Sequence, residues 1–215
     1  MNLSDSPEEA AFRAKAHEWL AANKPANVAD RGFALAVDEE SVRTLRDWQR
    51  RLYEAGFLGL SWPKEYGGQG LTIIEGAIFN EEMARVRAPA PLNELGLSMG
   101  APTILEHGTE DQKKRYISKI LSCEEIWCQG FSEPVSGSDL AALKTRAELQ
   151  GDEFVINGQK VWTSLGHIAD WCMLLVRTDA DAPKHRGISY ILVDMHSPGI
   201  TVRPLRQMTG EAEFI

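Results

Sequence analysis

One stretch of the sequence, from Gln129 to Asp139, combines residue types that are suited to holding an anion. It reads Gln-Gly-Phe-Ser-Glu-Pro-Val-Ser-Gly-Ser-Asp and lies between two runs of β-forming residues. Small residues let backbone N–H groups approach an anion closely, and successive N–H groups can form a nest for a phosphate. The spacing alone also fits an ordinary turn in which Ser138 or Asp139 caps nearby backbone groups. It is not the glycine-rich fingerprint of a dinucleotide-binding βαβ unit, because no G-x-G-x-x-G opens a helix after a strand.

The composition is that of an ordinary globular protein. The 215 residues are 43% hydrophobic and 25% charged, with a net charge of -8 and no run of Lys and Arg. Nucleic-acid binding needs a clustered positive surface, so we expect none. Three cysteines without C-x-x-C spacing and five scattered histidines predict reduced thiols and no metal site. No apolar run approaches the ~18 residues of a membrane span and the acidic N-terminus has no targeting pattern, so we expect a cytoplasmic protein.

The first half of the chain predicts helices. A capping box at Ser6–Glu9 opens the first helix, whose apolar residues recur at helical spacing. A second helix is expected over about 38–55, and a third should stop before Pro89, because a residue that precedes proline disfavours helix. Another capping box, Thr109–Gln112, opens a further helix. Together these elements predict an all-α domain over residues 1–124.

After the helical domain, β-forming runs alternate with turn signals, which predicts a β domain over residues 125–215. The pairs Gly151-Asp152 and Asn157-Gly158 each lie between two such runs, as in two-residue hairpins. Successive hairpins favour an antiparallel barrel or sandwich, so the expected fold class is α+β. Further strands are expected at 171–176, 188–193 and 200–202.

The last residues, Glu211–Ile215, have the pattern of the start of another strand. No turn or polar tail follows them. A β domain that ended there would leave an unpaired edge, which natural proteins usually avoid. We therefore expect these residues to be part of a longer polypeptide.

Two motifs of the β domain resemble the linked signatures of the acyl-CoA dehydrogenases. Ser132–Asp139 is similar to the family pattern (T/S)-E-P-x-(A/S)-G-S-D, and Ile156–Ser164 is similar to I-N-G-x-K-x-W-(I/T)-(T/S). Gly59–Gly68 resembles a loop motif of the family's N-terminal domain, and His107–Lys113 resembles the helix before its β domain. The resemblance extends over nearly the whole chain. It implies a helical domain, a middle β domain and a C-terminal four-helix bundle that these residues do not include, with FAD between the last two.

The resemblance also implies which residues hold the FAD. The residues matched to the family's cofactor contacts are Gln129, Phe131, Ser132, Gly137, Ser138, Trp162, Thr163 and Ser164. The first three should line the flavin ring, Trp162 should cover one of its faces, and Thr163 and Ser164 should address its N5/O4 side. Gly137 and Ser138 should lie at the flavin phosphate or at the CoA end of the acyl channel, which makes Ser138 a candidate for binding substrate. Such contacts bind, orient and tune a cofactor that performs the redox step itself.

The family oxidises an acyl-CoA thioester to its trans-2-enoyl form, with hydride transfer to N5 of FAD and an electron-transferring flavoprotein as the electron acceptor. A carboxylate removes the α-proton, and in this family that Glu belongs to the C-terminal bundle. No catalytic base is therefore assigned within these residues. Glu81, Glu82 and Glu133 each have a structural interpretation, the first two as solvated charges on a helix.

The resemblance further implies a homo-oligomer or a hetero-oligomer. The alternatives are a non-catalytic, FAD-poor partner subunit, an acyl-CoA oxidase, a flavin monooxygenase-like relative, or a β-rich binding module in which the Ser132–Asp139 loop is only a turn. Two residues depart from the family pattern. Val135 stands where many relatives have glycine, which would strain the backbone if φ were positive there. Gln129 stands where some relatives have an aromatic residue, which would alter the pocket around the acyl group.

Overall fold

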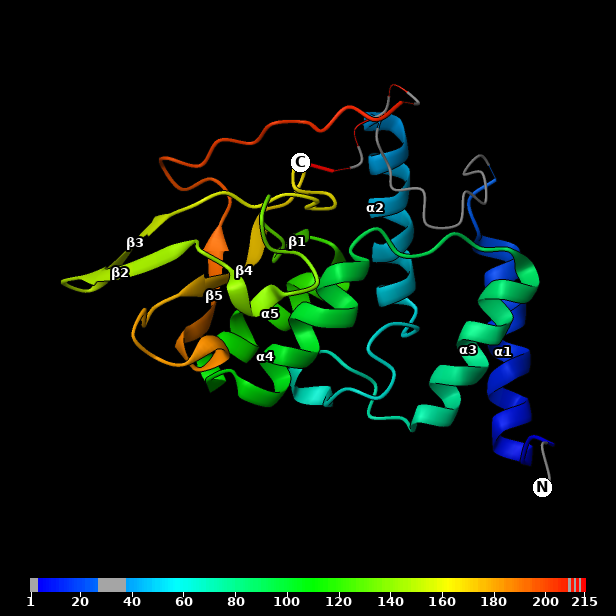
Figure 1. The fold of residues 1–215 in the computed structure, drawn as a ribbon. Helices are drawn as coiled ribbons and strands as arrows, with labels where there is room; N and C mark the ends of the chain where they lie inside the picture. Colours follow the sequence, from blue (N-terminus) through cyan, green and yellow to red (C-terminus); the bar gives the residue numbers. More distant parts are fainter. Residues whose placement is uncertain (1–3, 27–37, 209, 211, 213) are drawn as a thin grey trace. The chain divides into compact units, whose positions relative to one another are not determined.

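The computed structural model describes residues 4–26, 38–208, 210, 212 and 214–215. The chain divides into two compact units, residues 1–124 and residues 125–215. The first unit is helical and the second is built on a β-sheet (Figure 1). The α+β fold class expected from the sequence, with helices before strands, is confirmed.

Side-chain caps fix where the helices of the first unit begin. Ser6, Thr72 and Thr109 each form a capping box, so the boxes predicted at Ser6 and Thr109 are confirmed. Within the described ranges, no helix is long and apolar enough to cross a membrane. The helices are α1 Pro7–Asn23, α2 Glu39–Glu54, α3 Ile73–Val86, α4 Ala101–His107 and α5 Glu110–Ser122, with a π-helix at Gly96–Gly100 before α4.

Aromatic side chains form the centre of the helical unit. Trp19 of α1 stacks on Trp48 of α2 with ring centroids 5.7 Å apart, and Phe57 stacks on Phe79 of α3 at 5.2 Å. The indole N–H of Trp48 donates to the carbonyl of Pro89 at 2.9 Å, which satisfies the polar atom of a side chain that is otherwise buried. Helices α1 and α3 lie side by side (Figure 1). The apolar stripes predicted for these helices therefore face a common core.

The β unit contains one mixed five-stranded sheet. Strand β4 pairs in parallel with β1 and, at its last residue, with β2, and it pairs antiparallel with β5. The expected purely antiparallel barrel or sandwich is therefore wrong. Hairpin signals report only strands that are neighbours in sequence, whereas a long connection containing the β2–β3 hairpin separates β1 from β4. The strands are β1 Trp127–Gly130, β2 Arg146–Gln150, β3 Glu153–Asn157, β4 Trp171–Arg177 and β5 Ile188–Asp194.

One of the two predicted hairpins forms. Strands β2 and β3 pair antiparallel around Gly151, which has a φ of +64°. Asn157-Gly158 does not lead into another strand in the described part of the chain. Instead, the N–H of Val161 donates to the carbonyl of Ser132 at 2.9 Å. The residues after Asn157 are thus fixed by a contact distant in sequence, which local turn signals do not reveal.

The segment after β5 is only partly regular. The predicted strand at 200–202 is absent, although Gly199 has the positive φ of +92° expected of a turn residue. Near the end of the chain, Phe214 forms isolated β-bridges with Ser164 and with Leu205. Of the strand pattern expected at Glu211–Ile215, the residues 211 and 213 lie outside the described residues.

Candidate functional site

The loop that follows β1 (residues 131–139, the β1 loop) is shaped by a tight turn at Pro134-Val135. Glu133 and Ser136 exchange both of their backbone hydrogen bonds, at 2.8 and 3.0 Å. The hydroxyl of Ser136 donates to the carbonyl of Asp139 at 2.8 Å. Val135 does not have a positive φ, and the residue is 72% exposed. Valine at this position therefore causes no backbone strain.

The buried carboxylate of Glu133 joins the β1 loop to two other segments. One oxygen accepts a hydrogen bond from the N–H of Lys144 at 2.7 Å, and the other accepts from the N–H of Thr145 at 2.8 Å and from Nζ of Lys160 at 2.9 Å. Burial alone would raise the pKa of Glu133, but the hydrogen bonds from residues 144, 145 and 160 lower it to about 2. Glu133 is thus a carboxylate already engaged by three donors, which fits the structural interpretation better than that of a base.

The pKa of Lys160 is lowered, because burial outweighs the opposing effect of Glu133. Glu133 accepts bonds from three donors, whereas Lys160 faces a single carboxylate and the carbonyl of Phe131, to which Nζ donates at 3.0 Å. Nζ of Lys160 therefore lies within hydrogen-bond distance of two oxygen atoms of the β1 loop.

Trp162 has an unusual conformation next to the β1 loop. It follows Val161, which is hydrogen-bonded to Ser132, and its φ is +61°. A bulky residue in the left-handed region is strained by about 1–3 kcal/mol, and such strain is concentrated at functional sites. Trp162 is 57% exposed, and its indole meets the ring of Phe214 edge-on, with centroids 5.9 Å apart. This arrangement presents an aromatic surface beside hydroxyl-bearing residues.

The eight predicted flavin-site residues lie in β1, in the β1 loop and at residues 162–164. Thr163 lines a cavity of about 420 Å³ together with Gly130 and Lys160. Side chains alternate along a strand, so Gln129 points to the opposite face of the sheet from Gly130. Gln129, Phe131, Ser132 and Ser164 are half-buried, Gly137, Ser138 and Trp162 are exposed, and Thr163 is buried.

The residues present fit a flavin nucleotide. A Cβ placed on Gly137 would meet nothing within 4 Å, so the backbone of this exposed part of the loop is open to an approaching anion. Ser132 provides a hydroxyl group in the β1 loop, and Ser164 provides another two residues after Trp162. Together these groups can address the phosphate, the polar edge and the face of a flavin.

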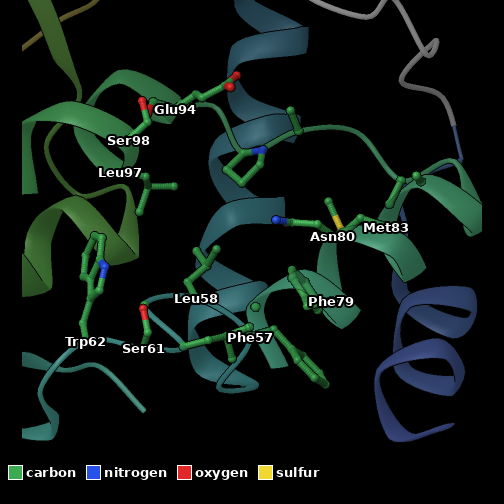
Figure 2. Close-up of a pocket in the computed structure, with 17 residues that line it drawn as sticks. Phe57, Leu58, Ser61, Trp62, Phe79, Asn80, Met83, Glu94, Leu97 and Ser98 are labelled. Atoms are coloured by element: carbon green, nitrogen blue, oxygen red, sulfur yellow. The ribbon is translucent and has the colours of Figure 1, made fainter. Parts of the chain in front are cut away.

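The helical unit has a groove of about 550 Å³ that the sequence did not predict (Figure 2). Figure 2 shows the side chain of Asn80 reaching toward the groove from α3, with Leu97 and Trp62 on the other side. Leu97 belongs to the π-helix Gly96–Gly100, a rare form that often occurs at functional sites. No simple periodicity marks such a helix in a sequence. The apolar lining includes Phe57, Leu58, Leu60, Trp62, Phe79, Met83, Pro91 and Leu97.

Glu82 on α3 is fully buried, so its interpretation as a solvated charge is wrong. Its carboxylate lies 3.0 Å from Arg13, 2.8 Å from Nδ1 of His17 and 3.0 Å from Arg85. Burial alone would raise the pKa of Glu82, but hydrogen bonds from Arg13 and His17 give a net lowering. Glu81 is 60% exposed, in line with its interpretation, and contacts Arg13 at 2.7 Å. Glu82 therefore links α1 to α3 and is not available as a base.

Side chains of the types that bind metals and the three cysteines are placed as follows in the residues that the structure describes. Among these residues, no three His, Cys, Asp or Glu side chains are grouped as a metal site. Cys123, Cys128 and Cys172 are buried and form no disulfide with one another. A hydrogen bond with Cys172 and burial raise the pKa of Cys128, which keeps this group a thiol.

Both units match models of one protein family. Residues 6–124 match the acyl-CoA dehydrogenase N-terminal domain, and residues 128–214 match the acyl-CoA dehydrogenase middle domain. The chain therefore belongs to the acyl-CoA dehydrogenase family.

Relatives and solved structures agree with this assignment. Acyl-CoA dehydrogenase IpdE1 of Mycobacterium tuberculosis is 45% identical over 205 residues, which cover 94% of this chain and 53% of that protein. The structure of the ChsE4–ChsE5 complex from Mycobacterium tuberculosis matches 100% of this chain and 53% of its own chain, with a TM-score of 0.83 and 35% identity. A steroid ACAD, Tcur3481–Tcur3483, matches with a TM-score of 0.83 and 36% identity over 100% and 55% of the two chains. The chain spans about half the length of these proteins.

Proposed function

We propose that these residues belong to an FAD-dependent dehydrogenase that converts an acyl-CoA thioester to its trans-2-enoyl form. The observation that carries the proposal is the joining of two motifs distant in sequence. The bonds from Val161 to Ser132 and from Lys160 to Glu133 bring the exposed indole of Trp162 to the hydroxyl-bearing β1 loop. When bound there, FAD supplies the hydride acceptor, and an electron-transferring flavoprotein then takes the electrons.

In this proposal the residues of the β unit bind and orient the cofactor. Ser132 and Ser164 offer hydroxyl groups to the polar edge of the flavin ring, and Trp162 covers one face and excludes water from it. The exposed backbone at Gly137 and Ser138 addresses a phosphate, either of FAD or of the CoA substrate. Thr163 is buried and pairs with Ile215 through both backbone groups at 3.1 Å, so it holds its neighbours in place.

We assign the acyl part of the substrate to the groove of the helical unit. Its volume of about 550 Å³ and its largely apolar lining are typical of sites for small apolar ligands. Asn80, Glu94 and Ser98 provide a few polar groups at its walls. The likeness to a steroid ACAD supports a bulky, ring-bearing acyl group in preference to a short straight chain.

The test uses the full-length protein supplied with FAD and an artificial electron acceptor. Short-chain, long-chain and steroid-side-chain CoA thioesters are compared, and the 2-enoyl-CoA product is detected by mass spectrometry. We expect kcat/KM to be at least about tenfold higher for the bulky thioester, and Leu97→Trp to lower it for that substrate because the indole fills the groove. Leu71→Trp, an exposed position outside the groove, is the control. Protein that holds FAD and yields no enoyl product from any thioester would refute the proposal.

A second candidate is that the protein is one subunit type of a heteromeric enzyme, in which one chain type lacks flavin. The solved relatives that favour it are a complex of two different proteins, ChsE4 and ChsE5, and the paired Tcur3481–Tcur3483. Native mass spectrometry of the protein purified from its own host distinguishes the two. Two chain types in equal amounts support the heteromer, whereas a single chain type saturated with FAD supports a homo-oligomer.

A further inference from the structure

Opposite charges from the two motifs meet in a buried pair. Glu133 and Lys160 are 27 residues apart in the sequence, and their side chains are only 5% and 10% exposed. Burying two charges is costly, and a buried ion pair persists only when good geometry and further hydrogen bonds compensate for the lost hydration. Here the compensation comes from backbone groups, since Glu133 accepts from the N–H groups of Lys144 and Thr145 and Lys160 donates to Phe131.

The contacts of this pair form a continuous series. Three consecutive residues of the β1 loop each bond to one of two consecutive residues of the second motif. The carbonyl of Phe131 accepts from Nζ of Lys160 at 3.0 Å, the carbonyl of Ser132 accepts from the N–H of Val161 at 2.9 Å, and Glu133 accepts from Nζ of Lys160 at 2.9 Å. These bonds fix the orientation of the two peptide planes at Ser132, and they fix the start of the segment that carries Trp162.

The neighbouring backbone leaves little freedom for another arrangement. A Cβ placed on Gly158 would lie 2.2 Å from Oγ1 of Thr145, so the chain between β3 and Lys160 is packed tightly against this residue. The N–H of Thr145 is itself one of the donors to Glu133. The pair is therefore set in a rigid surrounding.

We propose that Glu133 and Lys160 are positioning residues of the flavin site. They do not contact the cofactor themselves but hold residues 131–133 against residues 160–164, so that Ser132 and Trp162 are presented together. The inference rests on the proposed function. It differs from a purely stabilising role because it predicts a loss of FAD affinity in protein that remains folded.

The test compares matched variants of the full-length protein after FAD has been removed. Lys160→Met and Glu133→Gln each break the pair. Lys144→Met removes an exposed ammonium but keeps the backbone N–H that binds Glu133, and Glu148→Gln removes an exposed carboxylate on β2. FAD is titrated into each apoprotein well below its unfolding temperature, and binding is followed by flavin fluorescence.

We expect the Kd for FAD to rise about tenfold or more in both pair variants, because each loses a buried, charged hydrogen bond that holds Ser132 and Trp162 together. The Kd should change less than about twofold in the controls, because they lose only solvent-exposed charges. The double variant should bind FAD about as weakly as either single variant, since both remove the same interaction. Folded Lys160→Met protein with the FAD affinity of the wild type overturns the inference. Wild-type protein that binds no FAD overturns the proposed function itself, so the two failures are distinguishable.

Hydrogen exchange of the apoprotein separates positioning from general stability without using the cofactor. In Lys160→Met, the amides of residues 131–136 and 160–164 should exchange faster, while those of the β2–β3 hairpin should keep their protection. Equal acceleration throughout the β unit would show that the pair only stabilises the unit, and would overturn the positioning role.

Discussion

At the scale of single residues, two residues of the β unit differ in their surroundings: the buried, charged Glu133 and the strained, exposed Trp162. Glu133 is surrounded by donors and ties three segments of the chain together. Trp162 makes one edge contact with Phe214 and leaves most of its indole exposed. A positive φ and an exposed ring bring no evident gain in stability, and this fits the proposed role of Trp162 in covering the flavin.

The low pKa of Glu133 predicts a specific dependence of stability on pH. Its pKa is about 2 in the folded protein, below the usual value for Glu, so its contribution is fully present above about pH 4.5 and is lost as the pH falls toward 2. At neutral pH, Glu133→Gln should lower the free energy of unfolding by about 3 kcal/mol, the typical effect of breaking a buried pair. Urea unfolding at a series of pH values should show this difference shrinking below about pH 4.5. A difference that stays constant down to pH 2 would contradict the assignment.

The role of Trp162 is tested by an effect on FAD without a comparable effect on folding. Trp162→Ala should change the free energy of unfolding by less than about 1.5 kcal/mol, because the indole is exposed and loses only the contact with Phe214. FAD binding by the full-length protein should nevertheless weaken clearly. Leu149→Ala, at a 64% exposed apolar residue on β2 that does not line the cavity of Thr163, should leave FAD binding unchanged. Equal FAD affinities in the two variants would argue against the flavin role.

At the scale of elements, helix caps and the β2–β3 turn depend on neighbouring residues, whereas the order of the sheet depends on contacts distant in the sequence. The caps at Ser6 and Thr109 were predictable, because a cap and its partner lie three residues apart. Asn157-Gly158 does not form the predicted hairpin, because the contact of Val161 with the β1 loop decides the path of the chain. The parallel pairing of β1 with β4 has no local signal either.

The candidate site also has parts that the sequence predicts and parts that it does not. The two motifs could be predicted because each is a short continuous sequence. The pairing of their charges, and the groove beside the π-helix, depend on packing between segments distant in the sequence. The prediction that Glu82 is a solvated charge was wrong, because its burial depends on how α1 packs against α3. The sequence indicates this pair only through the opposite charges of Glu133 and Lys160, each of which lies inside one of the two motifs.

The packing of α1 against α3 predicts unequal effects for two adjacent glutamates. Glu82→Gln should lower the free energy of unfolding by about 3 kcal/mol or more, because it leaves Arg13 and Arg85 without their buried partner. Glu81→Gln, at a 60% exposed side chain that also contacts Arg13, should cost less than about 1 kcal/mol. Denaturant unfolding of the two variants measures the difference. Similar costs would mean that Glu82 is not the principal link between the two helices.

At the scale of the whole molecule, the two units carry different parts of the proposed chemistry. The helical unit provides an apolar groove, and the β unit provides the hydroxyl, backbone and aromatic groups suited to a flavin. The chain belongs to the acyl-CoA dehydrogenases and spans about half the length of the relatives described above. Activity is therefore to be measured on the full-length protein.

An anaerobic absorbance spectrum of the full-length protein, before and after addition of a CoA thioester, tests the central claim most directly. We predict a flavin spectrum whose visible absorbance bleaches when the bulky thioester is added, because the substrate reduces the bound FAD. A protein that takes up no FAD, or whose bound flavin keeps its absorbance with every thioester, would contradict the account.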